Sequence, residues 1–144
     1  MKGKAIEIGY QYVKIDLEQF AIIETNCNIQ QEVNFNNEIE FGYDKEQNIF
    51  KCSDELTVYQ NNTLLLKICL SSSFRIRPDD LPSLINDGKY VFSPNILSQF
   101  ASLNYGTLRG VLYEKLKGTP LNFIIIPPTY MNKFIKSPFE VNVE

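Results

Sequence analysis

The sequence predicts an α+β fold, in which a four-stranded antiparallel sheet is followed by a long helix and a short C-terminal helix. Residues 5–76 show the period-two alternation of half-buried strands, and residues 94–117 show helical spacing of apolar residues. The 144-residue chain is 44% hydrophobic and 22% charged, which is typical of a globular domain. We therefore expect one domain over residues 1–144, with strands in 5–76, a connector in 77–92 and helices at 94–117 and 129–136.

The first expected strand, 5–17, changes phase along its length. Its apolar residues occupy even positions and then odd positions: Ile6, Ile8, Tyr10 and Tyr12, followed by Val13, Ile15 and Leu17. A change of phase predicts either a β-bulge or a strand that passes from one environment to another.

Each of the next three strands, 33–43, 49–60 and 64–76, places apolar residues at alternate positions. Asn37 interrupts the apolar face of the first of these strands. Asp54 interrupts the face of the second, where a bulge is one explanation. Residues paired across a hairpin share a face, so the parity of the apolar positions predicts a four-residue loop at 45–48 and a three-residue loop at 60–62.

The segment 18–32 is too long for a hairpin turn and contains an unpatterned apolar cluster at 20–23. One interpretation is that it extends the first strand and then crosses over to the second. The other is that it forms one wall of a binding groove.

The helical half begins after a connector, 77–92, which has room for one helical turn and contains a turn signal at 86–88. Ser93 and Pro94 are typical of an N-cap and a first helical residue, and Gly118 is a common C-terminal cap. Six apolar residues form a stripe that we expect to cover the sheet: Leu97, Phe100, Ala101, Leu108, Val111 and Leu112.

A second strip of the long helix carries Ser102, Gly106 and Gly110, four residues apart. Glycine inside a helix costs about 1 kcal/mol relative to alanine. The strip is either a tolerated exposed surface or a smooth face that another helix approaches closely. We favour a subunit interface, because the neighbouring Leu103 and Tyr113 are poorly suited to solvent.

The last part of the chain combines Ile124–Ile126 with Pro127 and Pro128, which predicts a stiff extended segment. Thr129 is then expected to cap the short last helix. Its apolar residues, which serve either core packing or a groove, are Tyr130, Met131, Phe134 and Ile135.

Several functions are disfavoured by what the sequence lacks. There is no histidine, which removes the commonest general base and histidine-ligated metals, and the three cysteines have no C-x-x-C spacing. Phosphate-binding glycine motifs are absent, and the net charge of −3 disfavours a basic face for nucleic acid. No apolar run approaches the ~20 residues of a membrane span. We therefore expect a cytoplasmic protein that is not an enzyme, holds no cofactor or metal, and inserts into no membrane.

The order of motifs in the C-terminal half resembles that of the SecB family. A Ser-Pro-Asn-Ile-Leu run at 93–97 opens the long helix, Gly118-Thr119-Pro120-Leu121-Asn122 follows it, and Pro127-Pro128 precedes the segment around Phe134. In the N-terminal half, Glu32-Val33 and the strand 64–76 are similar to the second and fourth strands of that family.

The resemblance implies a dimer of dimers that acts as an ATP-independent holdase, binding unfolded or partly folded polypeptides in apolar grooves and delivering them to the export motor SecA. For this chain we expect a homo-oligomer, either a dimer or a tetramer. We expect the client groove to contain Phe20, Ile22, Ile23, Ile124, Ile126, Tyr130, Met131 and Phe134. The positions that the resemblance places toward SecA are Asp16, Glu18, Leu65 and Lys67. Lys67 carries the opposite charge to the family's acidic residue there.

Two functions remain open from the sequence. One is a general holdase linked to protein export. The alternative is a dedicated chaperone or interaction protein that serves one specific partner and is not coupled to the export motor.

Overall fold

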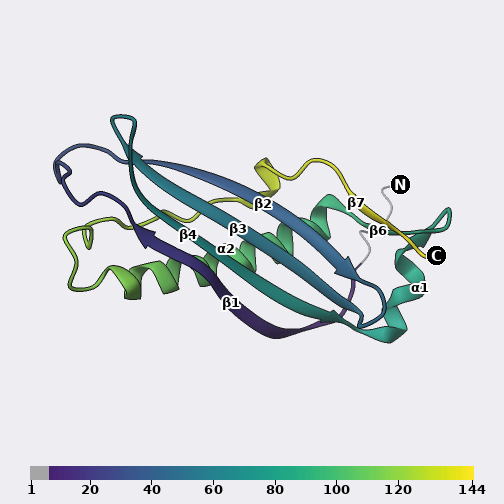
Figure 1. Ribbon diagram of the computed structural model, residues 1–144. Helices are drawn as coiled ribbons and strands as arrows, with labels where there is room; N and C mark the ends of the chain where they lie inside the picture. Colours follow the sequence, from purple (N-terminus) through teal and green to yellow (C-terminus); the bar gives the residue numbers. More distant parts are fainter. Residues whose placement is uncertain (1–6) are drawn as a thin grey trace.

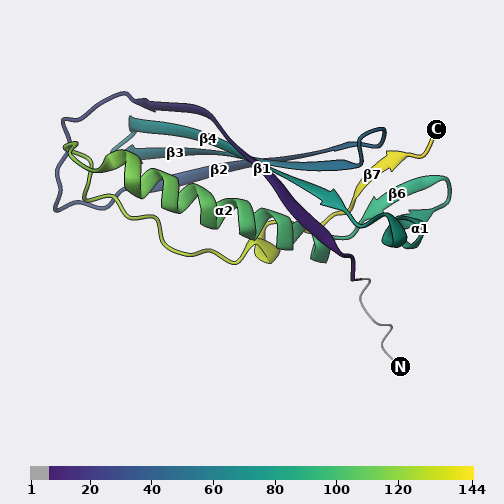
Figure 2. The same cartoon turned by 90° about the horizontal axis from the view of Figure 1, so that it is seen from below.

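The computed structural model describes residues 7–144, which form a four-stranded sheet, a long helix and a small second sheet. The four long strands are β1 (Tyr10–Ile22), β2 (Asn34–Asp44), β3 (Ile49–Gln60) and β4 (Thr63–Ile76). They pair antiparallel in the order β1-β4-β3-β2, so β1 and β2 form the two edges (Figure 1). The long helix α2 (Pro94–Leu116) lies on one face of this sheet (Figure 2). This architecture confirms the predicted α+β fold.

Two bulges explain the change of phase in β1. The register of β1 against β4 shifts between Tyr12 and Lys14, and it shifts again between Leu17 and Gln19. Before the first shift Tyr12 pairs with Phe74, between the shifts Leu17 pairs with Leu70, and after the second Phe20 pairs with Ile68. Paired residues share a face, so these apolar residues of β1 all lie on the face that α2 covers. The strand continues to Ile22, which confirms the strand-extension interpretation, and the expected start at residues 5 and 6 lies outside the described residues.

The two hairpins differ in how well the sequence predicted them. The four-residue loop 45–48 is confirmed, because Asp44 pairs with Ile49. The expected three-residue loop at 60–62 is wrong, because Gln60 pairs with Thr63 across a two-residue turn. Residues 61 and 62 both have positive φ, as a tight hairpin turn requires. The parity argument failed because the register shifts between Val58 and Tyr59: Tyr59 pairs with Leu64 and Val58 pairs with Leu66, so Leu65 is an extra residue of β4.

The connector holds more structure than the single turn that was expected. A short 3-10 helix, η1 (Pro78–Asp80), leads into α1 (Leu81–Leu84). The strands β5 (Ile85–Asn86) and β6 (Lys89–Phe92) then form a hairpin, and the C-terminal β7 (Phe139–Asn142) pairs with β6.

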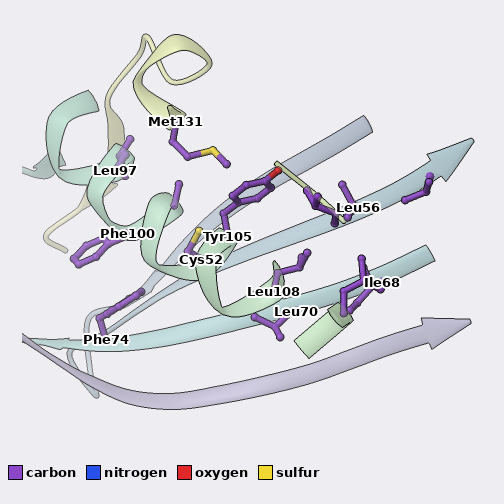
Figure 3. Close-up of a cluster of buried hydrophobic side chains, with 14 of the residues drawn as sticks. Cys52, Leu56, Ile68, Leu70, Phe74, Leu97, Phe100, Tyr105, Leu108 and Met131 are labelled. Carbon is purple, nitrogen blue, oxygen red and sulfur yellow. The ribbon is translucent and has the colours of Figure 1, made fainter. Parts of the chain in front are cut away.

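The core lies between α2 and the covered face of the sheet. Ser93 caps the helix by accepting a hydrogen bond from the Ile96 N–H, and Gly118 follows the helix with a φ of +76°. Phe100 of α2 stacks on Phe74 of β4 with ring centroids 4.4 Å apart. Figure 3 shows how side chains from α2, β3 and β4 meet in this core.

The last helix is shorter than expected. Residues 129–136 contain one 3-10 turn, η2 (Met131–Lys133), and its N-cap residue is Tyr130, with no side-chain cap from Thr129. The segment before it is extended, as the two prolines predicted. Tyr105 and Arg109 of α2 hold this segment in place by donating to the carbonyls of Pro127 and Ile126, at 3.0 and 2.8 Å.

Among residues 7–144, no helix is both long and apolar enough to cross a membrane.

Candidate functional site

A cleft of about 600 Å³ lies between the edge strand β2 and the C-terminal segment. One side of the cleft is the face of β2 that points toward α2. The other side is formed by η2 and the residues that follow it. We name this the edge cleft. Most of its lining is apolar, and the residues concerned are Phe35, Asn36, Asn37, Ile39, Phe41, Met131, Phe134, Ile135, Lys136 and Ser137.

The backbone of β2 is available for pairing along the edge cleft. In the described part of the chain, β2 has one strand neighbour, β3, and its other edge pairs with no strand. An edge strand presents alternating N–H and C=O groups that an extended peptide can pair with. Phe134 stands beside this edge with 64% of its surface exposed. The cleft thus offers both backbone hydrogen bonds and apolar area.

The floor of the edge cleft also contains a polar pair. Asn37 lines the cleft, and Asp54 of β3 lies behind it with 1% of its surface exposed. With its amide nitrogen turned toward Asp54, Asn37 donates to the carboxylate oxygens Oδ1 and Oδ2 at 2.9 and 3.2 Å. Burial raises the pKa of Asp54 to about 7. The hydrogen bonds from Asn37 act on this pKa in the opposite direction, because they favour the carboxylate.

The structure divides the groove that the sequence predicted. Met131 and Phe134 line the edge cleft, although Met131 is 1% exposed and serves mainly as core. Phe20 and Ile22 belong to β1, at the opposite edge of the sheet, and the exposed Ile23 follows them. The structure thus places part of the predicted groove in the edge cleft and part at the other edge of the sheet, with two strands between them.

The remaining groove residues also lie apart from the edge cleft. Ile124 and Ile126 are 3% and 4% exposed, so they pack in the core. Tyr130 is 75% exposed and lines a different hollow, beside the first turns of α2.

Sequence reasoning missed the β2 side of the cleft. The alternation of Phe35, Ile39 and Phe41 was visible, and so was Asn37 as its exception. Alternation shows that a face is covered, but it does not show whether a helix, a loop or a client covers it.

The strip of α2 that carries Ser102, Gly106 and Gly110 is exposed to solvent in this protomer. A Cβ atom added at either glycine would meet nothing within 4 Å. The two glycines border a hollow of about 330 Å³, whose wall includes Tyr113, 56% exposed, and Ile125, 67% exposed. The surface is therefore smooth and flanked by apolar side chains.

The uncovered face of the sheet holds ion pairs. Glu18 accepts from Lys51 at 2.8 Å and from the Ser71 hydroxyl at 2.8 Å, and these bonds lower the pKa of Glu18. Lys67 pairs with Glu55 at 2.6 Å, and that bond raises the pKa of Lys67. Charges on this face therefore largely neutralise each other.

The four positions expected to face SecA do not form one exposed set. Asp16, paired with Lys14 at 3.2 Å, lies on this face together with Glu18 and Lys67. Leu65 does not, because it is 1% exposed and its carbonyl accepts from the N–H groups of the segment after β1. The register shift in β4 moves it out of the expected alternation.

Comparison with known proteins identifies the fold. The structure is similar to that of the Mycobacterium tuberculosis Rv1957 SecB-like chaperone, which was solved in complex with a ChAD peptide from the Rv1956 HigA1 antitoxin. The TM-score is 0.56 at 10% sequence identity, and the similarity covers 83% of this chain and 87% of that chain. No protein-family model matches the sequence, and no curated protein matches it. The chain therefore has a SecB-like α+β fold.

Proposed function

We propose that the protein is an ATP-independent chaperone that binds extended segments of unfolded or partly folded polypeptides in the edge cleft. The observation that carries this proposal is the cleft itself, where an open strand edge and exposed apolar side chains such as Phe134 lie side by side. The peptide complex of the Rv1957 chaperone, which shares the fold, supports it.

Binding of this kind needs no fixed sequence. Backbone pairing to β2 uses groups that nearly every residue has, and burial of apolar area contributes about 25 cal/mol per Å² whichever apolar side chain supplies it. Phe134, 64% exposed, supplies a large apolar surface beside the edge.

The test is suppression of aggregation of a chemically denatured model protein, followed by light scattering. We expect wild type to suppress aggregation at stoichiometric amounts. Phe134→Ser should weaken suppression about tenfold, because it removes apolar contact area in the cleft. Ile85→Ser is the matched control, since Ile85 is also exposed but lies in β5, away from the cleft. Equal suppression by wild type and Phe134→Ser would contradict the proposal.

A dedicated chaperone for one partner is the second candidate. The Asn37–Asp54 pair favours it, because a polar group in an apolar floor makes binding selective. A panel of unrelated denatured proteins separates the two candidates. A general holdase keeps most of them soluble, whereas a dedicated chaperone protects few.

We also propose that the chain assembles into a dimer or tetramer through the Ser102, Gly106 and Gly110 strip. The open space at both glycines and the apolar flanks support this proposal. We propose that SecA binds this protein only weakly, because the uncovered face of the sheet carries paired charges of both signs.

A further inference from the structure

A hollow of about 830 Å³ lies over the exposed side of the first turns of α2, next to the strip formed by Ser102, Gly106 and Gly110. We name it the α2 hollow. Its lining includes Ser98 and Ser102 of α2, and Tyr130 forms part of one wall with 75% of its surface exposed. Because Ser102 belongs to both, the α2 hollow is continuous with the strip that we propose as an interface.

Ser98 is the unusual residue of the α2 hollow. It is 8% exposed, and its hydroxyl has no hydrogen-bond partner among residues 7–144. Buried polar groups in native proteins nearly always have a partner, because leaving one unpaired costs stability. An open hollow beside an unpartnered hydroxyl therefore points to a group from outside the protomer.

A second copy of the chain offers such a group in Tyr113. Tyr113 is 56% exposed and stands at the other end of the strip, where it lines a hollow together with Gly110. It is seven residues after Gly106, whereas Gln99 is seven residues before it. Seven residues are close to two helical turns, so Gln99, Gly106 and Tyr113 lie on one face of α2. This face thus has the α2 hollow at one end and an exposed tyrosine at the other.

Two-fold packing of this face on a second copy joins the two ends. When the helices cross antiparallel at Gly106, each residue lies opposite the one that is equally far from Gly106 in the other direction. The partner subunit's Tyr113 then lies opposite Gln99, which lines the α2 hollow beside Ser98. The absence of a side chain at the crossing point lets the two helices approach closely.

Charge favours this antiparallel packing over parallel packing. Parallel helices would place Lys115 and Lys117, at the end of α2, beside the same residues of the other copy. Antiparallel helices bring these lysines toward the first turns of α2, where Glu7 lines the α2 hollow. The positive end of each helix dipole then lies near the negative end of the other.

We infer that the α2 hollow is the docking site for Tyr113 of a second copy, whose hydroxyl donates a hydrogen bond to the Ser98 hydroxyl. The inference rests on the proposed assembly through the strip, and it names the contact that fixes the direction of that assembly. Tyrosine suits the site, because its ring buries apolar area against Tyr130 while its hydroxyl reaches a polar partner. Two-fold symmetry forms the contact twice in each interface.

The first test measures the dissociation constant of the assembly by analytical ultracentrifugation. Tyr113→Phe removes only the hydroxyl, and because two hydrogen bonds are lost in each interface the dissociation constant should rise about tenfold. Ser98→Ala should raise it by a similar factor without lowering the thermal stability of the dilute protein, because Ser98 has no partner among residues 7–144. The double variant should be no weaker than either single variant, since both remove the same bond. Tyr59→Phe is the matched control, because Tyr59 of β3 lines neither hollow.

The second test uses cysteine cross-linking to establish the direction of packing. A mixture of the Gln99→Cys and Tyr113→Cys proteins should form a cross-linked pair after subunit exchange, whereas Tyr113→Cys alone should form none. Wild type, which has cysteines at positions 27, 52 and 69, is the control for background cross-linking.

The outcomes separate this inference from the proposed assembly. If wild type assembles but Tyr113→Phe and Ser98→Ala leave the dissociation constant unchanged, the contact is overturned while the interface proposal stands. Cross-linking of Tyr113→Cys to itself has the same meaning, because it shows parallel packing. If wild type is monomeric, both ideas fail.

Discussion

Asn37 and Asp54 each interrupt an alternating apolar row, and in the folded chain the two interruptions are hydrogen-bond partners. Asn37 lies across from Leu56, and Asp54 lies across from Ile39, so the pair is a diagonal one on a single face. A bulge does not explain Asp54, since β3 pairs with β2 and with β4 without a register shift there. Two exceptions on neighbouring strands thus indicated one structural feature.

The buried carboxylate makes stability depend on pH. An unfolded aspartate has a pKa near 3.8, and burial raises the pKa of Asp54 to about 7 in the folded chain. Between these values the folded state binds more protons than the unfolded state, so the free energy of unfolding falls as the pH rises. We expect a loss of up to about 4 kcal/mol from this group between a pH of about 4 and a pH of about 7.

Denaturant titrations of wild type and Asp54→Asn at several pH values measure this effect. Asp54→Asn keeps a hydrogen-bonding partner for Asn37 but cannot ionise, so its stability should change less over that range. If both proteins lose the same stability across it, Asp54 does not titrate in this window.

A second buried amide stabilises the contact between α2 and the sheet. Asn104 is fully buried, accepts from the Ser72 hydroxyl at 2.6 Å and donates to the Leu70 carbonyl at 3.1 Å. Asn104→Ala should lower the free energy of unfolding by about 2 kcal/mol, because it removes two buried hydrogen bonds between α2 and β4. Thermal unfolding measures the loss, and Asn95→Ala, at an exposed asparagine in the same helix, should cost well under half as much.

Among the elements, those with a regular period were predicted and those that depend on distant pairing were not. The alternation in β2, β3 and β4 predicted the sheet, and the cap residues Ser93 and Gly118 predicted the ends of α2. The strand β7 was missed, because four residues carry too little pattern and its partner β6 lies far back in the chain. The length of the last helix was overestimated, because the cluster of apolar residues at 130–135 does not by itself indicate how many residues are helical.

The candidate site was harder to predict than the fold, because it joins two elements that are distant in sequence. Met131 and Phe134 were recognised as groove residues, whereas their partners on β2 were predicted only as the apolar face of a half-buried strand. The order of strands decides which apolar residues share a surface. That order places β1 and β2 at opposite edges, and alternation within one strand carries no information about it.

The smooth strip of α2 yields a prediction about assembly. Gly106→Leu places a bulky side chain on the strip, where the added Cβ meets nothing within the protomer, so the monomer should fold while the oligomer dissociates. Light scattering measures the mass, and circular dichroism checks the helix. Gly106→Ala is the matched control, because it raises helix propensity with little added volume. A wild-type protein that is monomeric would contradict the proposed interface.

At the scale of the whole molecule, the sheet has two unlike faces. One is covered by α2 and the C-terminal segment, and the other is left bare by the described residues (Figure 2). The bare face carries the ion pairs Lys51–Glu18 and Lys67–Glu55. Exposed pairs of this kind contribute at most about 1 kcal/mol each to stability, so their main effect is on partner choice.

Charge on the bare face sets the expected strength of SecA docking, which the family resemblance implies for an acidic surface. Lys67→Glu should strengthen binding of SecA, because it removes a positive charge and releases Glu55 from its ion pair. The gain should shrink as salt is raised, since added ions screen exposed charges. Lys115→Glu changes the net charge equally but lies on α2, so it is the control. Binding measured at low and moderate salt decides the matter. Tight binding of wild type that Lys67→Glu leaves unchanged or weakens would mean that the export motor, if bound, uses other residues.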